Sequence, residues 1–225
     1  MKNLLLAIML FFPFVANTQE EKKYPFEDLY LEMDTMSLEH RTQLEANIKA
    51  QEEKFRKEQV KGICGVPFGS SKEKALSILK NKYGEPLGSL GLNFVFESIS
   101  YAGQNFNTAI FSFQSDGLNT YLYQCIFVKN AKTFNEALDL EKEFADVLSE
   151  KYTNMYRIPD ENGNPMHVCG ISPFWNGNMR DLTTSDNMAI HTSIIATDNN
   201  TELTTGAKYY VRIIYGPYNY VKEEF

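Results

Sequence analysis

The stretch FGSSKEKALSILKNKYGEP, residues 68–86, predicts one complete helix with a signal at each end. Ser70 and Glu73 have the spacing of a capping box, in which two side chains satisfy backbone N–H groups of the first turn. Apolar side chains recur at helical spacing, at Ala75, Leu76, Leu79 and Tyr83. Gly84 ends the helix, and Pro86 prevents it from resuming.

A second helix with the same signals is expected about 69 residues further on. Thr133 and Glu136 form its capping box. Its apolar stripe consists of Phe134, Ala137, Leu140, Phe144, Leu148 and Tyr152. The segments ILKNKY (78–83) and VLSEKY (147–152) share Leu, Lys and Tyr at this offset, which suggests an internal repeat.

Each expected helix is followed by three strand-like segments with turn signals between them. The first three are residues 92–101, 106–114 and 120–129, and the second three are residues 165–171, 187–197 and 208–216. A polar and aromatic loop, 172–186, separates the first two segments of the second set. Short turns imply antiparallel pairing with the helices on one face. The pattern predicts an α+β fold made of two α-β-β-β pseudo-repeats, about 62–130 and 131–225, within one domain.

The N-terminus has the layout of a signal peptide. Lys2 precedes an apolar run from Leu4 to Ala16, and a polar stretch follows. We expect residues 1–18 to be removed before Gln19; the alternative is an uncleaved N-terminal anchor. The mature protein is then expected to be periplasmic or secreted, with no stable membrane insertion.

Residues 19–61 differ in composition from the rest of the chain and predict a charged helical arm. From Ser37 to Val60 the segment has helical character, with Leu44, Ile48 and Phe55 near one face. This apolar stripe is thin, so the arm is expected to be mobile or to dock lightly on the domain.

The charge of the chain argues against nucleic acid as a partner. The formal net charge is −7. No basic run is present, and binding to a phosphate backbone needs clustered Lys and Arg.

The helix at 68–86 resembles the corresponding element of the SmpA/OmlA small outer-membrane proteins and the repeat unit of beta-lactamase-inhibitory-protein-like domains. The later segment ISYAGQNFNTAIFSF is similar to a strand pair of secreted proteins of that fold, many of them from gut Bacteroidetes. The chain lacks the lipidated cysteine of the small lipoproteins. The resemblance implies a curved antiparallel sheet with helices on one side and its other face open, and it carries no catalytic residues.

Candidate reactive residues are few. Cys64 with His167 or His191 could form the nucleophile and base of a cysteine-dependent hydrolase. His167 and Cys169 share a strand face, but a zinc site needs three or four ligands, so no metal or other cofactor is predicted. With Cys125 the thiols number three, so at least one stays unpaired within the monomer, and the sequence leaves the pairing open.

Binding residues are suggested by residue type and strand alternation. Trp175 and Arg180 lie in the aromatic loop, and Trp, Tyr and Arg dominate binding hot spots. His191, Tyr210 and Arg212 are expected on the open face of the sheet, opposite the helices. The sequence therefore favours a non-enzymatic binding module, inhibitory or scaffold-like, for an unknown protein or glycan; the alternative is the hydrolase.

Overall fold

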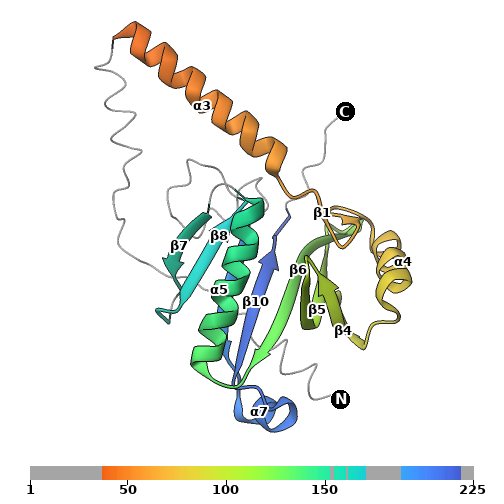
Figure 1. The fold of residues 1–225 in the computed structure, drawn as a ribbon. Helices are drawn as coiled ribbons and strands as arrows, with labels where there is room; N and C mark the ends of the chain where they lie inside the picture. Colours follow the sequence, from red (N-terminus) through yellow and green to blue (C-terminus); the bar gives the residue numbers. More distant parts are fainter. Residues whose placement is uncertain (1–36, 153–154, 161, 171–188, 219–225) are drawn as a thin grey trace.

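The computed structural model describes residues 37–152, 155–160, 162–170 and 189–218 as an α+β fold (Figure 1). The helices are α3 (Leu38–Glu58), α4 (Lys72–Tyr83), α5 (Phe134–Lys151) and α7 (Asn199–Thr205). The strands are β1 (Gly62–Ile63), β2 (Val66–Pro67), β3 (Gly88–Leu90), β4 (Asn93–Tyr101), β5 (Gln104–Ser115), β6 (Thr120–Ala131), β7 (Met155–Pro159), β8 (Pro165–Cys169), β9 (Ile190–Ala196) and β10 (Tyr209–Tyr215).

Eight of these strands form one antiparallel sheet in the order β3-β4-β5-β6-β10-β9-β8-β7. Helices α4 and α5 each precede four strands of this sheet: β3–β6 follow α4, and β7–β10 follow α5, with the short helix α7 between β9 and β10. The last strands of the two sets, β6 and β10, pair at the centre of the sheet. All six predicted strands are confirmed, and each set has one further short strand, β3 or β7, at an outer edge of the sheet.

The predicted caps are confirmed at α5 and shifted by one residue at α4. The Thr133 hydroxyl accepts a hydrogen bond from Glu136 N at 3.1 Å, as expected. At α4 the cap is Ser71, whose hydroxyl accepts from Lys74 N. The prediction of Ser70 was wrong because its carbonyl accepts from Leu122 N of β6, which keeps the chain extended there.

Helix α3 begins after the cap residue Ser37 and extends away from the sheet (Figure 1). Leu44 and Ile48, two residues of its predicted apolar stripe, are half-buried. Among the helices that the structure describes, none is long and apolar enough to cross a membrane. The predicted signal peptide lies outside the described residues.

Helices α4 and α5 contribute to one hydrophobic cluster on a single face of the sheet. From the helices come Ala75, Leu79, Ala137, Phe144 and Leu148; the sheet supplies, among others, Phe96, Phe111, Phe127, Val211, Ile213 and Tyr215. The residues from β10 alternate with Tyr210 and Arg212, which the sequence predicted on the side opposite the helices. Below, this side is called the helix face, and the opposite side is called the second face.

The second face is not open at its centre, so that expectation from the family resemblance was wrong. Its central aliphatic side chains are only 1–6% exposed: Val95, Ile110, Ile126, Val128 and Ile214. The physical reason is visible in strands β5, β6 and β10, where the runs AIF, CIFV and II are apolar on both sides. Continuous apolar runs indicate strands buried on both faces, whereas a solvated face produces alternation.

Candidate binding site

The pairing of β4 with β5 is interrupted at Ser98 and Asn107. Ser98 has a φ of 54°, in the left-handed region that costs a non-glycine residue roughly 1–3 kcal/mol. The alternation of side chains is reset here, because Phe96 and Ile99 both lie in the helix-face cluster although they are three positions apart. This break in the pairing, with the left-handed residue at its centre, is called the kink at Ser98 below.

Strands β5 and β6 stop pairing next to the same position, Asn107. Their ladder ends at the pair Thr108 and Val128, and in the described chain the following residues of β6 pair with β10 alone. A side chain bridges the gap: Asn107 Oδ1 accepts a hydrogen bond from Asn130 N at 2.9 Å. The sheet therefore has an internal opening, which we call the β5–β6 notch.

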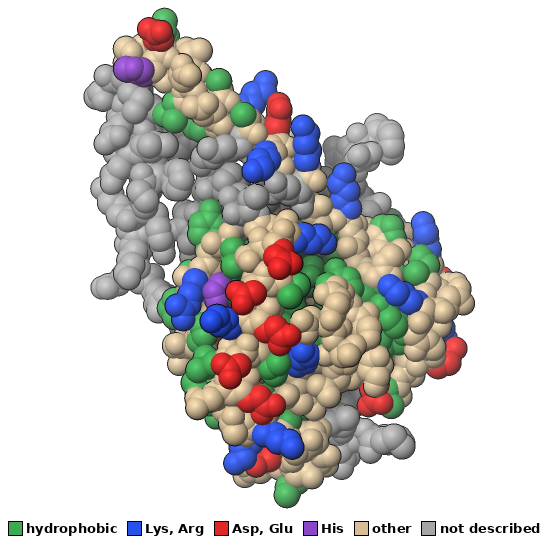
Figure 2. All heavy atoms as spheres, in the orientation of Figure 1, with side chains coloured by type: hydrophobic (Ala, Val, Ile, Leu, Met, Phe, Trp, Pro, Cys, Tyr) green, Lys and Arg blue, Asp and Glu red, His purple; other side chains and the backbone are tan. Residues whose placement is uncertain are grey.

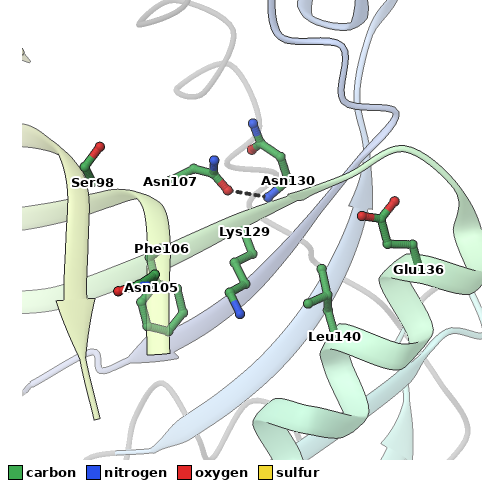
Figure 3. A pocket seen from close by; sticks show the side chains of 8 residues that line it. All are labelled: Ser98, Asn105, Phe106, Asn107, Lys129, Asn130, Glu136 and Leu140. Atoms are coloured by element: carbon green, nitrogen blue, oxygen red, sulfur yellow. Dashed lines mark hydrogen bonds between the residues drawn. The ribbon is translucent and has the colours of Figure 1, made fainter. Parts of the chain in front are cut away.

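The notch is a hollow of about 500 Å³ beside α5 (Figure 3). Figure 3 shows the Lys129 side chain reaching from β6 into the space between β5 and Leu140 of α5. Six of the eight lining residues are polar, and they come from β4, β5, β6 and α5: Ser98, Asn105, Phe106, Asn107, Lys129, Asn130, Glu136 and Leu140.

Neighbouring polar groups hold Lys129 in place. Its Nζ donates to Gln104 Oε1 at 2.9 Å and lies 3.9 Å from Glu143 Oε2. Gln104 Nε2 donates to the other oxygen of Glu143 at 2.8 Å. The ammonium also lies 5.5 Å from the centre of the Phe144 ring. This positive charge is thus fixed at the wall of the notch with part of its hydrogen-bonding capacity left for a ligand.

The chemistry of the notch suits binding. Within the described part of the chain, the amide nitrogens of Asn105 and Asn107 have no hydrogen-bond acceptor, although their oxygens accept from Ser100 and from Asn130 N. The lining contains no histidine or cysteine that could pair with the Ser98 hydroxyl. Figure 2 shows acidic and basic side chains interspersed over the face covered by α5, without a large basic patch.

Three of the five binding residues predicted from the sequence lie together on the second face. His191 belongs to β9, and Tyr210 and Arg212 belong to the adjacent strand β10. Trp175 and Arg180 lie outside the described residues, so their predicted role in binding stays a prediction. None of the three described residues lines the notch.

Each of these three side chains is half-buried rather than fully accessible. Arg212 Nε donates to Ser193 Oγ at 2.8 Å, and burial lowers the pKa of Arg212 to about 10. Burial and the nearby Arg212 lower the pKa of His191 to about 4. Burial also raises the pKa of the Tyr210 hydroxyl.

We expect His191 to destabilise the fold as the pH falls from about 6.5 to 4. Its pKa is about 4 in the folded chain and 6.5 when unperturbed, so the unfolded chain takes up the proton first. At pH 4.5 this difference lowers the free energy of unfolding by about 2–3 kcal/mol. Between pH 7 and pH 4.5, the free energy of unfolding measured by urea denaturation should fall by about 2–3 kcal/mol less for His191→Gln than for the unmodified protein.

The control for this experiment is His40→Gln, because His40 is exposed on α3. His40→Gln should retain the acid sensitivity of the unmodified protein. If His191→Gln loses stability with pH as steeply as the control, the ring is not held neutral in the folded state.

A polar network beneath α5 was missed by the sequence analysis. The Glu141 side chain, in a residue that is 1% exposed, accepts a hydrogen bond from Thr192 Oγ1 of β9 and lies 2.7 Å from His167 Nδ1 of β8. His167 N in turn donates to Thr192 Oγ1 at 2.8 Å. The signal was an acidic residue within the apolar stripe of α5, between Ala137 and Phe144.

The three thiols, at Cys64, Cys125 and Cys169, are free and buried. Burial raises the pKa of Cys64, which opposes formation of the thiolate that a cysteine hydrolase needs. His167, one proposed base, belongs to β8 in the second set of strands, and its Nδ1 lies 2.7 Å from Glu141 Oε1 of α5. No observation in the described residues favours the hydrolase.

Comparison of the chain with protein-family models, with curated proteins and with solved structures finds no match. The resemblance to the SmpA/OmlA proteins and the beta-lactamase-inhibitory-protein-like domains stays a prediction from the sequence. The β5–β6 notch therefore provides the geometry and chemistry from which a function can be inferred.

Proposed function

We propose that the protein is a non-enzymatic binding module, periplasmic or secreted, whose β5–β6 notch binds a glycan. The observation that carries the proposal is the group of three asparagines, Asn105, Asn107 and Asn130, around one hollow. Its volume of about 500 Å³ falls within the range of roughly 300–1,000 Å³ typical of small-molecule sites. The assignment to the periplasm or the exterior rests on the predicted signal peptide.

The residue types in the notch match the chemistry of a sugar. Each sugar hydroxyl both donates and accepts, and an asparagine amide offers a donor and an acceptor side by side. Ser98 and Lys129 add a hydroxyl and a cation. Leu140, which is half-buried on α5, supplies apolar surface for the C–H groups of the ring. A protein partner is less well matched, because the polar lining is confined to a small hollow.

We further propose that the two halves of the sheet are pseudo-repeats of one α-β-β-β unit, each extended by a short edge strand. The mirrored strand order about the β6–β10 pair supports this relation. Equivalent tyrosines support it too: Tyr83 is the last residue of α4, and Tyr152 caps α5. The notch then represents a specialisation of the first half, at the kink of Ser98.

The test replaces two notch amides together, as Asn105→Ala with Asn130→Ala. The probes are four neutral disaccharides: cellobiose, maltose, lactose and N,N′-diacetylchitobiose. For any disaccharide that binds the mature protein, the double variant should bind about tenfold to hundredfold more weakly in calorimetric titration, because two or more hydrogen bonds are lost.

Asn119→Ala is the matched control, since Asn119 is an exposed asparagine in the β5–β6 turn. It should bind the same disaccharide as tightly as the unmodified protein does. Equal affinity of the double variant and the control would place the sugar elsewhere. Failure of all four disaccharides to bind would contradict the assignment of a neutral glycan.

A further inference from the structure

The second face of the sheet carries a cation that has no counter-charge in the described chain. Arg212 pairs across the ladder with Ser193 on one side and with Val128 on the other. Continuing along this row, the next residues are Thr108 and Glu97. Glu97 is three strands from Arg212, which corresponds to about 14 Å, too far for an ion pair.

The hydrogen bonding of Arg212 is also incomplete. Its described partner is the neutral hydroxyl of Ser193, which accepts from Nε at 2.8 Å. The two terminal NH₂ groups of the guanidinium have no acceptor among the described residues. A half-buried charge without an opposite charge is costly, so a ligand that brings a negative charge to the guanidinium would bind favourably.

A second unpartnered polar atom lies beside this arginine. His191 is on the same face, two residues before Ser193 in β9, and its Nδ1 is buried with no hydrogen-bond partner among the described residues. The ring is neutral at pH 7, because burial and Arg212 lower its pKa to about 4. A neutral imidazole offers one N–H donor and adds no second positive charge.

We propose that Arg212, Ser193 and His191 form a binding site for the carboxylate of a small organic acid. The planar guanidinium presents two parallel N–H groups that match the two oxygens of a carboxylate. A single positive charge balances a monoanion, whereas it would leave a phosphate dianion under-compensated. The ligand is small because the neighbouring side chains of Val128 and Ile214 are 3% and 6% exposed.

This site is independent of the β5–β6 notch, since none of its three residues lines the notch. The probe is sodium acetate, compared with sodium chloride at equal ionic strength and pH 7. Acetate at ten times its dissociation constant should raise the melting temperature by about 3 °C. Arg212→Gln should abolish the acetate-specific rise.

Arg157→Gln is the matched control, because Arg157 is an exposed arginine on β7. It should retain the rise. A second measurement needs no variant: in the unmodified protein, acetate should shift the Nε–H NMR resonance of Arg212 and leave that of Arg157 unchanged. Equal melting temperatures of the unmodified protein in the two salts, a rise that survives Arg212→Gln, or an unmoved Arg212 resonance would each overturn the proposal.

Discussion

Replacing Glu141 with alanine should lower the free energy of unfolding by about 3–5 kcal/mol, because it removes one partner from a buried polar network. The residue is 1% exposed, and its carboxylate accepts from Thr192 and contacts His167 Nδ1 at 2.7 Å. Without it, both groups are left under α5 with no acceptor. Thermal denaturation should show a melting temperature about 10 °C lower.

Two further variants separate the network from general effects on the helix. Asp139→Ala changes an exposed carboxylate of the same helix and should alter stability by less than about 0.5 kcal/mol. Glu141→Gln keeps one acceptor oxygen and should cost only about 1–2 kcal/mol. A Glu141→Ala protein that melts within 2 °C of the Asp139→Ala protein would show that α5 does not bury this carboxylate against β8 and β9.

The second large effect is expected for Phe127→Ala, at the centre of the sheet. Phe127 is completely buried, and its ring stacks on Tyr101 at 4.7 Å between centroids and contacts Phe106 at 4.9 Å. Truncation of such a ring leaves a cavity and costs about 3–5 kcal/mol. Urea denaturation should show this loss as a lower midpoint with an unchanged slope.

The matched control is Phe134→Ala, which truncates a phenylalanine that is 39% exposed at the start of α5. It should cost about 1 kcal/mol or less, even though its ring lies near Tyr209. If both phenylalanine variants lose the same stability, the ring of Phe127 is not packed in the interior of the sheet as the structure shows.

Most of the fold follows from local sequence signals. The cap at Thr133 and the apolar stripes of α4 and α5 are patterns within a single element, as is the alternation in β10. At α4 the sequence placed the cap one residue too early, at Ser70 instead of Ser71. The short edge strands were not predictable in this way. Residues 88–90 (GSL) and 155–159 (MYRIP) lack a distinctive pattern, and they form strands because β4 and β8 offer them free edges.

The burial of the second face was misjudged for a different reason. Alternation in β9 and β10 correctly placed His191, Tyr210 and Arg212 on one side, but polar character was taken as a sign of exposure. The aliphatic neighbours on β5 and β6 decide how buried that side is, and register across four strands is a tertiary property.

The β5–β6 notch could not be located from the sequence because it depends on pairing. Nothing in the local sequence requires Ser98 to adopt a left-handed conformation or the β5–β6 ladder to stop at Thr108. Residues 105–130 contain four asparagines, of which three line the notch, but asparagine is also common in turns. Their convergence on one hollow results from the way β5 and β6 separate.

The most direct test of the central claim, that the notch binds a sugar, is NMR of the asparagine side-chain amides in the mature protein. Titration with the four disaccharides should shift the amide NH₂ resonances of Asn105, Asn107 and Asn130 together, with one common dissociation constant, while Asn119 stays unchanged. A disaccharide that binds yet leaves these three resonances in place, or moves only residues of the second face such as Tyr210, would contradict the account.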